Sequence, residues 1–354
     1  MKIPVVFAAL SLIGAAHAQW SATYLNPAGA SYSNALGVTG NSQAGYVTKA
    51  GNDHASLWSG SAASWVDLNP VGSAFSQALA ADGSHQVGTA YAGAIHASLW
   101  SGTAASWVDL NPLSAPYSIA LGVSGNRQTG YATIGSNWHA GMWSGTAASW
   151  VDLNPSGALY SNGQAISGNR VAGYTMKNSQ GRASLWTGSA ASWVDLNPAG
   201  ADFSEALGIS ADQEVGDFYE GGLHHAAVWS DTAASVIDLS PAGSSGSYAA
   251  AVTQGYQVGY SSIGGTQRAS LWNGSAASWV DLGSFLAPNY TTSAAEAIWA
   301  DGTATYIAGF AHNDTTGRDE AVLWTGPGIA AVPEPTSLAA LALGAVALLR
   351  RRRR

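Results

Sequence analysis

The stretch HASLWSGSAASWVDLNP, residues 54–70, recurs along the chain and predicts its fold. Its first part ends in an apolar residue followed by tryptophan, and the equivalent tryptophans are Trp58, Trp100, Trp143, Trp186, Trp229, Trp272 and Trp324. Five of the six spacings between them are 42 or 43 residues, and the last is 52. A fixed period of this length is typical of proteins built from stacked structural repeats.

Each repeat contains four short pieces with the character of β-strands. The first is a small apolar run, such as residues 119–122, and the second centres on Gly-Tyr or a related pair, such as Gly130-Tyr131. The third ends at the HASLW tryptophan, and the fourth is SWVDLNP. Pairs such as Gly40-Asn41 separate the first two pieces and indicate hairpins, because both residue types tolerate positive φ. Four antiparallel strands in about 43 residues indicate a β-propeller blade.

The fourth piece is one copy short within the repeats. After Trp324 the chain has no WVDLNP segment, but residues 20–27 (WSATYLNP) match its end, with Tyr24 in place of the aspartate. We therefore predict an all-β fold, a seven-bladed β-propeller over residues 19–327, whose N-terminal strand completes the seventh blade as its outermost strand. Closure of this kind leaves no open end to the ring. The small residues of the first pieces should lie near the crowded axis.

The N-terminal residues have the pattern of a secretory signal peptide. Lys2 provides the positive charge, residues 4–15 are mostly apolar, and Ala16-His17-Ala18 is a small-x-small cleavage site. We predict that residues 1–18 are removed after Ala18 during export through the Sec translocon.

The C-terminal residues have three parts. A linker, residues 328–337, contains Val332, Pro333, Glu334 and Pro335. The apolar run of residues 338–349 follows, and it is shorter than the roughly 20 residues that span a bilayer comfortably. The chain then ends in Arg350, Arg351, Arg352, Arg353 and Arg354, a basic stop that stays on the cytoplasmic side. Residues 338–354 are thus predicted to be a short sorting helix with an arginine tail; an ordinary membrane anchor is the alternative.

This tail resembles the PEP-CTERM sorting signal of Gram-negative bacteria. The resemblance implies that an exosortase-type enzyme reads residues 332–335, that the chain passes through an inner-membrane intermediate, and that it reaches the cell surface or the extracellular space. It also implies an association with extracellular polysaccharide. The repeats resemble the extracellular HAF repeat family, because residues 54–58 and Asp67-Leu68 keep its pattern. That second resemblance implies an exported repeat protein and no particular activity.

The composition excludes several functions. Cysteine is absent, so disulfides and thiol chemistry are excluded. Between Gln19 and Pro335 there are 7 Lys and Arg against 21 Asp and Glu, a net charge of −14. A domain this acidic repels polyanions, and we expect no nucleic-acid partner.

One repeated position carries mostly cationic or titratable side chains. Four residues before each third-strand tryptophan stand His54, His96, His139, Arg182, His225, Arg268 and Glu320. These side chains would form a circle that contacts an anion or a polysaccharide near the axis. Alternatively, they are half-exposed residues at strand starts, tied to the preceding turn. Equivalent residues on neighbouring blades are too far apart to share an ion, so we predict no metal site.

Most other recurring residues are predicted to serve the fold. The tryptophans should pack in the core, and the repeated aspartate of WVDL should make a turn or edge hydrogen bond. The fifth repeat differs by its acids, which are Asp202, Glu205, Asp212, Glu214, Asp217 and Glu220. Two of them could act as a general acid and base or bind Ca²⁺; alternatively they form a solvated face. The seventh repeat carries about nine additional residues, and insertions often carry function.

We expect neither a cofactor nor catalysis, since the sequence has no GxSxG, HExxH or phosphate-binding glycine loop. The predicted function is that of an exported, non-catalytic structural or binding protein of the cell surface or extracellular matrix. The alternative is a propeller enzyme, a lyase or glycosidase acting on extracellular polysaccharide.

Overall fold

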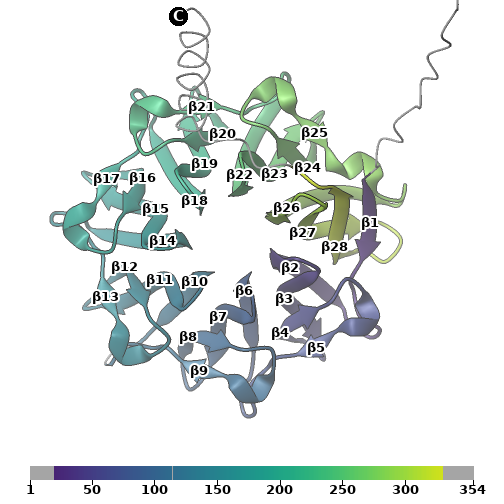
Figure 1. The fold of residues 1–354 in the computed structure, drawn as a ribbon, viewed down its shortest axis with the longest axis horizontal. Coiled ribbons are helices and arrows are strands. Elements are labelled where there is room, and N and C mark those ends of the chain that lie inside the picture. Colours follow the sequence, from purple (N-terminus) through teal and green to yellow (C-terminus); the bar gives the residue numbers. More distant parts are fainter. Residues whose placement is uncertain (1–19, 114, 330–354) are drawn as a thin grey trace, which may run out of the picture.

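A computed structural model describes residues 20–113 and 115–329 as a closed ring of seven four-stranded antiparallel sheets (Figure 1). Each sheet is one blade, and its four strands follow one another outward from the central axis. The predicted all-β, seven-bladed β-propeller is confirmed.

The blades are numbered from the first complete one. The innermost strands of blades 1 to 7 are β2 (Tyr32–Thr39), β6 (Ser76–Asp82), β10 (Ser118–Ser124), β14 (Tyr160–Ser167), β18 (Phe203–Ser210), β22 (Ser244–Thr253) and β26 (Tyr290–Ala300). The second strands are β3 (Ser42–Lys49), β7 (His85–Tyr91), β11 (Arg127–Ile134), β15 (Arg170–Lys177), β19 (Gln213–Glu220), β23 (Tyr256–Ile263) and β27 (Ala304–Asn313).

The third strands are β4 (Asn52–Trp58), β8 (Ile95–Trp100), β12 (Asn137–Trp143), β16 (Gln180–Trp186), β20 (Leu223–Trp229), β24 (Thr266–Trp272) and β28 (Arg318–Pro327). The outermost strands of blades 1 to 6 are β5 (Val66–Asp67), β9 (Val108–Asp109), β13 (Val151–Asp152), β17 (Val194–Asp195), β21 (Ile237–Asp238) and β25 (Val280–Asp281). In blade 7 this place is taken by β1 (Ser21–Tyr24).

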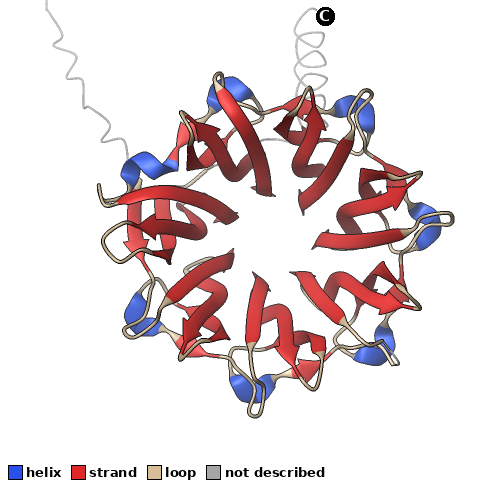
Figure 2. Cartoon of the chain, turned by 180° about the vertical axis from the view of Figure 1, so that it is seen from behind, coloured by secondary structure: helices blue, strands red, loops and turns tan. Residues whose placement is uncertain are grey.

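Short 3₁₀ helices join the third and fourth strands at the rim of the ring (Figure 2). They are η1 (Ala62–Ser64), η2 (Ala104–Ser106), η3 (Ala147–Ser149), η4 (Ala190–Ser192), η5 (Ala233–Ser235) and η6 (Ala276–Ser278), and η7 (Leu282–Phe285) follows β25. The repeated SGSAAS segment forms this turn because its last serine closes it. In blade 1 the Ser64 hydroxyl accepts a hydrogen bond from the Ser59 amide at 2.7 Å and donates one to the Ser61 carbonyl at 2.6 Å.

The N-terminal strand closes the ring, as predicted. β1 pairs with β28 in a register that places Ala22 opposite Trp324. The chain beyond β1 stays in the same sheet, because the Leu25 amide donates to the Ala321 carbonyl at 2.8 Å. Leu25 is fully buried, like Leu68 at the equivalent place in blade 1. The first and last described strands are therefore held in one blade by hydrogen bonds and by packing.

A β-bulge in every innermost strand shapes the wall of the central channel. The residues skipped by the pairing are Leu36, Leu79, Leu121, Gln164, Leu207, Ala250 and Glu296, and all of them line the channel. The bulge also explains the glycine of the Gly-Tyr motif, since a Cβ on Gly130 would lie 1.9 Å from the Ile119 carbonyl oxygen. Neighbouring blades crowd the axis, where a Cβ on Gly37 would lie 2.6 Å from the Ala81 nitrogen.

Tryptophan side chains fill the space between adjacent blades. The third-strand tryptophan of each blade is fully buried. Trp58 of blade 1 packs in one cluster with Leu25, Ala321 and Leu323 of blade 7, and Trp100 of blade 2 packs with Leu68 of blade 1. The core is thus a series of similar clusters between blades, and the prediction that these tryptophans serve packing is confirmed.

A buried serine links each blade to the one before it. In blade 2, the Ser76 hydroxyl accepts a hydrogen bond from the Ala55 amide of blade 1 at 3.0 Å and donates one to Asn69 Oδ1 at 2.6 Å. Equivalent bonds to a backbone amide of the preceding blade are made by Ser33, Ser118, Ser161, Ser204, Ser247 and Ser293. The DLNP segment therefore supplies a polar clamp at the blade boundary.

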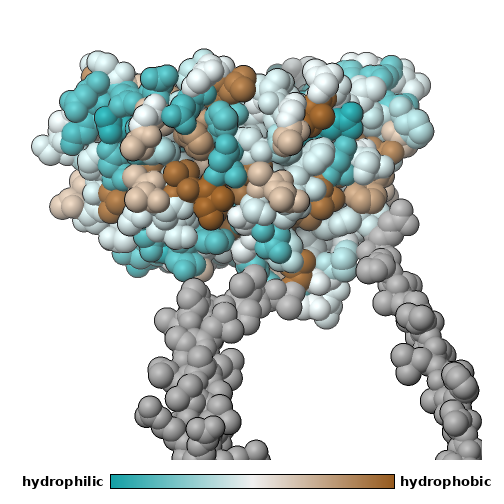
Figure 3. Space-filling view, turned by 90° about the horizontal axis from the view of Figure 1, so that it is seen from above, coloured by the Kyte–Doolittle hydropathy of each residue, from teal (hydrophilic) through white to brown (hydrophobic). Residues whose placement is uncertain are grey.

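The ring has two faces, named here by the turns they carry. The 1–2 face carries the turns between the first and second strands together with η1 to η6, and the 2–3 face carries the turns between the second and third strands. On the rim, apolar side chains lie among polar ones at mid-height (Figure 3). The valine of WVDL, on the outermost strands, is exposed, with a value of 41% at Val66.

Deletion of residues 19–27 should open blade 7 and destabilise the whole ring. The chain loses the pairing of β1 with β28 and the burial of Leu25, a cost of several kcal/mol. For a domain of this size we expect the melting temperature to fall by about 10 °C or more. Circular dichroism melts of the deleted and full chains measure the difference. Deletion of nine residues at the other end, 346–354, is the length-matched control, and equal melting of all three proteins would disprove closure by β1.

Candidate functional site

The predicted circle of cationic residues lies between the third and outermost strands. In six blades each residue pairs with the aspartate of WVDL, and the pairs are His54–Asp67 (2.8 Å), His96–Asp109 (2.8 Å), His139–Asp152 (2.7 Å), Arg182–Asp195 (2.7 Å), His225–Asp238 (3.0 Å) and Arg268–Asp281 (2.7 Å). The expected position near the axis is wrong, because two strands stand between this circle and the channel. A contact with an external ligand stays a prediction.

The paired aspartate also caps the turn that follows it. Asp67 Oδ1 accepts a hydrogen bond from the Asn69 amide at 2.8 Å, while its Oδ2 contacts His54. This confirms the expected turn bond. The circle is therefore the outer end of the clamp that joins neighbouring blades.

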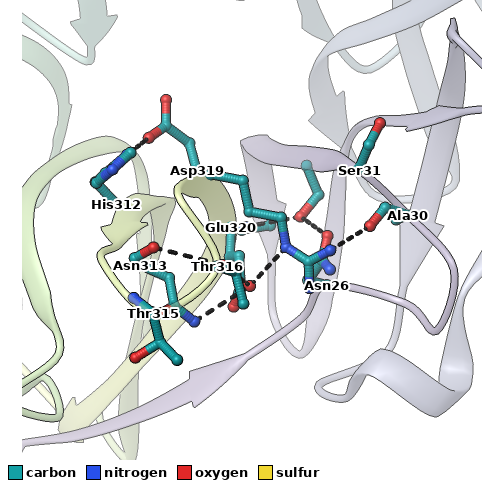
Figure 4. A network of polar contacts seen from close by, with 12 residues as sticks. Asn26, Ala30, Ser31, His312, Asn313, Thr315, Thr316, Asp319 and Glu320 are labelled. Atoms are coloured by element: carbon teal, nitrogen blue, oxygen red, sulfur yellow. Dashed lines mark hydrogen bonds and ion pairs between the residues drawn. The ribbon is translucent and has the colours of Figure 1, made fainter.

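Blade 7 replaces this pair by a different network (Figure 4). Glu320 stands where the other blades have a cation, and it accepts hydrogen bonds from Tyr290 at 2.6 Å and from Arg318 at 2.9 Å. Tyr24, which replaces the aspartate, stacks on Tyr290 with ring centroids 4.3 Å apart. Arg318 also donates to the Ala30 carbonyl at 2.7 Å, which joins blade 7 to the loop leading into blade 1. Both departures from the repeat thus serve the closure.

The central channel encloses a cavity of about 390 Å³. Its wall is mostly aliphatic, with Leu36, Leu79, Leu121 and Leu207 from four blades. Among the described residues of the wall, Glu296 of blade 7 is the one acidic side chain, and burial raises the pKa of its carboxyl.

An aromatic arc crosses blades 3 and 4 on the 2–3 face. It consists of Tyr117, Tyr131, Trp138, Tyr160 and Tyr174, whose successive ring centroids are 6.0, 5.3, 6.1 and 6.2 Å apart. Trp138, at the start of β12, is 45% exposed, whereas Tyr131 beneath it is 9% exposed. Neighbouring rings are tilted or edge-on to one another, and Trp138 presents the most exposed ring. Partly exposed aromatic rings gathered in this way are suited to contact with apolar faces of a ligand.

A blade-5 cluster, consisting of Glu205, Asp217 and His224, lies beside this arc on the same face. Glu205 on β18 is the register partner of Asp217 on β19. Asp217 is fully buried, and its Oδ2 lies 2.6 Å from His224 Nδ1 on β20. Burial is the main cause of the raised pKa of Tyr174, and the charge of Glu205 adds to it. The carboxyl of Glu205 therefore acts electrostatically on the end of the arc.

Burial changes the acidity of the blade-5 cluster. It raises the pKa of Asp217 to about 7, and burial together with the nearby Asp217 charge raises that of Glu205 to about 7. Burial also lowers the pKa of His224. Two carboxyls this close hold one proton between them more readily than isolated ones do. Near neutral pH the cluster can therefore exchange protons and still carry negative charge.

The acids expected in the fifth repeat do not form one group. The structure brings together only Glu205 and Asp217, and it adds His224, which precedes a member of the cationic circle in sequence. Glu214 lies near the other end of β19, towards the 1–2 face, where Arg170 of blade 4 contacts it at 2.5 Å. The three remaining acids, Asp202, Asp212 and Glu220, are exposed.

The aromatic arc is not among the sites predicted from the sequence, although the sequence contains a signal for it. Tyr117 and Tyr160 occupy the same place near the start of the innermost strand, and Tyr131 and Tyr174 are the tyrosines of the Gly-Tyr motif. Trp138 stands outside the repeat pattern, just after a turn. Repeated aromatic residues at two strand positions, joined by one irregular tryptophan, predict a surface row only once the blade geometry is known.

The terminal candidates lie outside the described residues. These are the cleavage residues Ala16 and Ala18, the sorting motif from Val332 to Pro335, and the arginines from Arg350 to Arg354. In the part of the chain that the structure describes, no helix is long and apolar enough to cross a membrane. Within residues 20–113 and 115–329, no three His, Asp or Glu side chains are placed to share a metal ion.

Comparison with known proteins identifies the C-terminal signal and the fold. The family model described as PEP-CTERM protein-sorting motif matches residues 331–354. The chain is thus an exported protein with the signal that exosortase recognises, and its path leads through the membrane to the cell surface. The resemblance of the repeats to the HAF family stays a prediction. The chain matches no curated protein.

Solved structures with a similar fold include two puromycin-hydrolysing enzymes and one isolated propeller. A puromycin hydrolase aligns with a TM-score of 0.53 and 11% identity, over 84% of this chain and 56% of that one. A puromycin-hydrolyzing peptidase from Mycobacterium tuberculosis aligns with a TM-score of 0.54 and 14% identity, over 84% and 55%. The β-propeller domain of the Trilobed protease from Pyrococcus furiosus gives 0.53 and 10%, over 83% and 95%.

At these identities the likeness shows the fold alone. The chain spans about half the length of the puromycin-hydrolysing enzymes it matches.

Replacement of Glu205 by Gln should change how stability depends on pH. Both carboxyls of the blade-5 cluster have raised pKa values, so the folded state binds more protons than the unfolded state between about pH 4 and 7, and stability falls as pH rises through that window. His224, with its lowered pKa, acts in the opposite direction at acid pH. Glu205→Gln should therefore stabilise the protein relative to wild type by about 1–3 kcal/mol above neutral pH and by less at acid pH.

Urea denaturation at about pH 5 and about pH 8 measures this difference. Asp212→Asn, an exposed carboxylate in the same blade, is the control and should track the wild type at both values. A Glu205→Gln stability curve parallel to that of the wild type would show that the pair is not charged and buried as described.

Proposed function

We propose that this chain is a non-catalytic binding protein of the cell surface or extracellular matrix that holds neutral glycan on its 2–3 face. The observation that carries the proposal is the aromatic arc, because pyranose rings have apolar faces that stack on aromatic side chains. The PEP-CTERM match supports the location, since it implies export towards the cell surface. The net charge of −14 over residues 19–335 disfavours a polyanionic glycan.

The near-identity of the blades supports a scaffold role. Six blades repeat the cation–aspartate pair, and seven repeat the serine clamp. Side chains that are engaged in holding the ring together are not available for catalysis. Export through the Sec translocon, processing by an exosortase and a transient inner-membrane stage belong to the same proposal, and exopolysaccharide is the proposed partner.

A propeller enzyme is the second candidate, and the blade-5 cluster favours it. This cluster breaks the symmetry of the ring, and two carboxyls with raised pKa values beside a histidine resemble the groups that donate and accept protons in glycoside cleavage. Release of reducing ends from a glycan by the wild type, abolished in Asp217→Asn, would establish this alternative over the non-catalytic one.

Replacement of Trp138 by Ala should weaken glycan binding by about tenfold, because it removes the most exposed ring of the arc. The wild-type chain, purified in detergent, is first screened on an array of neutral and charged oligosaccharides, and the best ligand is titrated by calorimetry. Affinity should change little with added salt, since stacking is not screened. Val66→Ala, 41% exposed on the outermost strand of blade 1, is the control. Unchanged affinity in Trp138→Ala would refute the arc as the binding surface.

Replacement of Pro333 and Pro335 by Ala should block sorting. Proline restricts φ and lacks a backbone donor, so the sequence predicts that Pro333 and Pro335 keep the motif out of the predicted sorting helix, and that alanine at both positions would let the motif join it. We expect the precursor to stay in the inner membrane with its tail attached, which fractionation and immunoblotting would detect. Leu341→Ala in the apolar run leaves the motif intact and serves as the control. Normal removal of the tail from the double variant would mean that residues 338–354 are a simple anchor.

A further inference from the structure

One acidic sector of the 2–3 face lies next to the aromatic arc. The sector contains Glu205 and Asp217 of blade 5 and Glu296 of blade 7, which lines the channel. Blade 6 lies between them and contributes Tyr248 and Tyr260. Burial raises the pKa of Tyr260 to about 12, and the charges of Asp217 and then Glu296 add to this effect. The three carboxyls therefore act on one small region near the mouth of the channel.

No lysine or arginine in the part of the chain that the structure describes neutralises this sector. All seven are engaged elsewhere: Arg182, Arg268 and Arg318 pair with acids of their own blades, and Arg170 pairs with Glu214. Arg127 donates to Asn169, while Lys49 and Lys177 lie over the rim residues Trp65 and Trp193. The histidine that does contact Asp217 is His224, and burial lowers its pKa. The sector thus keeps uncompensated negative charge.

One buried oxygen of this sector has no partner. Asp217 is fully buried, and its Oδ1 has no hydrogen-bond partner among the described residues, although Oδ2 is bonded to His224. A buried acceptor of this kind is costly unless a donor reaches it, and the proton that Glu205 and Asp217 share is such a donor only while the pair is protonated. Glu205, directly across the sheet, is half-buried and opens the pair to the surface.

Aromatic rings surround the acids. His224 lies between Tyr219 and Tyr248, with centroid distances of 4.9 and 4.8 Å, and Tyr248 stacks on Tyr260 at 4.9 Å. Ring faces together with carboxylates form an environment that attracts organic cations, because each ring adds a cation–π contact to the charge pairing. A small inorganic ion would not use the rings.

We propose that this acidic sector binds a protonated amine, carried by an amino-sugar unit within the otherwise neutral glycan that the aromatic arc holds. The inference rests on the proposed function and names the ligand chemistry. The arc ends at Tyr174 on β15 of blade 4, and Glu205 stands on β18, the adjoining innermost strand of blade 5. A chain of sugars that contacts blades 3 and 4 therefore leads towards the carboxyl pair. The ammonium group donates to the half-buried Glu205 carboxylate, while the buried Asp217 acts on it through its charge, and the sugar ring lies against Tyr248. An N-acetylated sugar lacks this charge and gains nothing from the pair.

The test compares two hexasaccharides that differ only in acetylation. The full chain in detergent is titrated with a glucosamine hexamer and with an N-acetylglucosamine hexamer at about pH 7, where the carboxyl pair still carries negative charge and a fraction of the sugar amines is protonated. We expect the wild type to bind the glucosamine hexamer about tenfold more tightly, a difference of about 1.4 kcal/mol. Added salt should reduce this preference, because charge pairing is screened.

Two isosteric variants test which carboxyl causes the preference for the glucosamine hexamer. Glu205→Gln should remove most of it and leave binding of the acetylated hexamer unchanged. Glu214→Gln is the matched control, since it removes the same charge from the same blade near the 1–2 face, and glutamine fills the equivalent position at Gln43, Gln86, Gln128 and Gln257. It should keep the full preference. Melting curves of each variant confirm that the ring is intact.

The outcomes separate this inference from the proposed function. Equal affinity for both hexamers in the wild type, or a preference that survives in Glu205→Gln, would overturn the amine site and leave glycan binding by the arc standing. Spermidine is the third probe, and it tests whether the sector binds an amine that is not part of a sugar. If spermidine alone binds as tightly as the glucosamine hexamer, and Trp138→Ala has no effect on either, the ligand is a free amine and the amino-sugar assignment fails.

Discussion

The packing of one tryptophan into the preceding blade is the interaction on which the ring depends. A buried tryptophan removes roughly 150–250 Å² from water, which stabilises the fold by about 4–6 kcal/mol. In six blades the indole N–H is buried without a partner among the described residues, at a cost of about 1–3 kcal/mol. The free energy gained by burying the indole exceeds the cost of its unpaired N–H, so the same tryptophan packing can be used at every blade boundary. Only Trp324, at the last boundary, also donates its N–H, to the Leu282 carbonyl at 3.0 Å.

Closure requires contacts in blade 7 that the other blades do not need, because its outermost strand comes from the opposite end of the chain. The ion pair that joins third and fourth strands elsewhere is replaced by the stacked rings of Tyr24 and Tyr290 and by the network around Glu320. Stacking gives contact area without requiring two opposite charges to be matched across segments about 300 residues apart in sequence. The additional residues of the seventh repeat supply Tyr290 and extend β26, so this insertion contributes to closure.

The repeats made the fold predictable, because the same pattern of strand and turn residues recurs in all seven repeats. Strand count, hairpin turns and the place of residues 20–27 followed from that pattern, and the structure confirms them. The position of His54 and its equivalents did not follow. Their spacing from tryptophan fixes the strand, but the partner, Asp67, is fixed by the pairing of β4 with β5, which local sequence does not display. The arc could not be predicted for a related reason, because Trp138 contacts Tyr160 across a blade boundary and local sequence does not show this contact.

The departures from symmetry are the most informative part of the surface. At the place of Asp217 the other blades carry Tyr46, Tyr131, Tyr174 and Tyr260, and also Thr89 and Phe310, so the fold has several uncharged solutions for this position. A buried carboxyl there is less favourable for stability than any of them, because burial opposes its charged form. Arg170 compensates the other buried acid of the blade, Glu214, but no arginine of the described chain reaches Asp217. An uncompensated charge placed beside exposed ring faces is therefore explained better by what it contacts from outside than by anything it does for the ring.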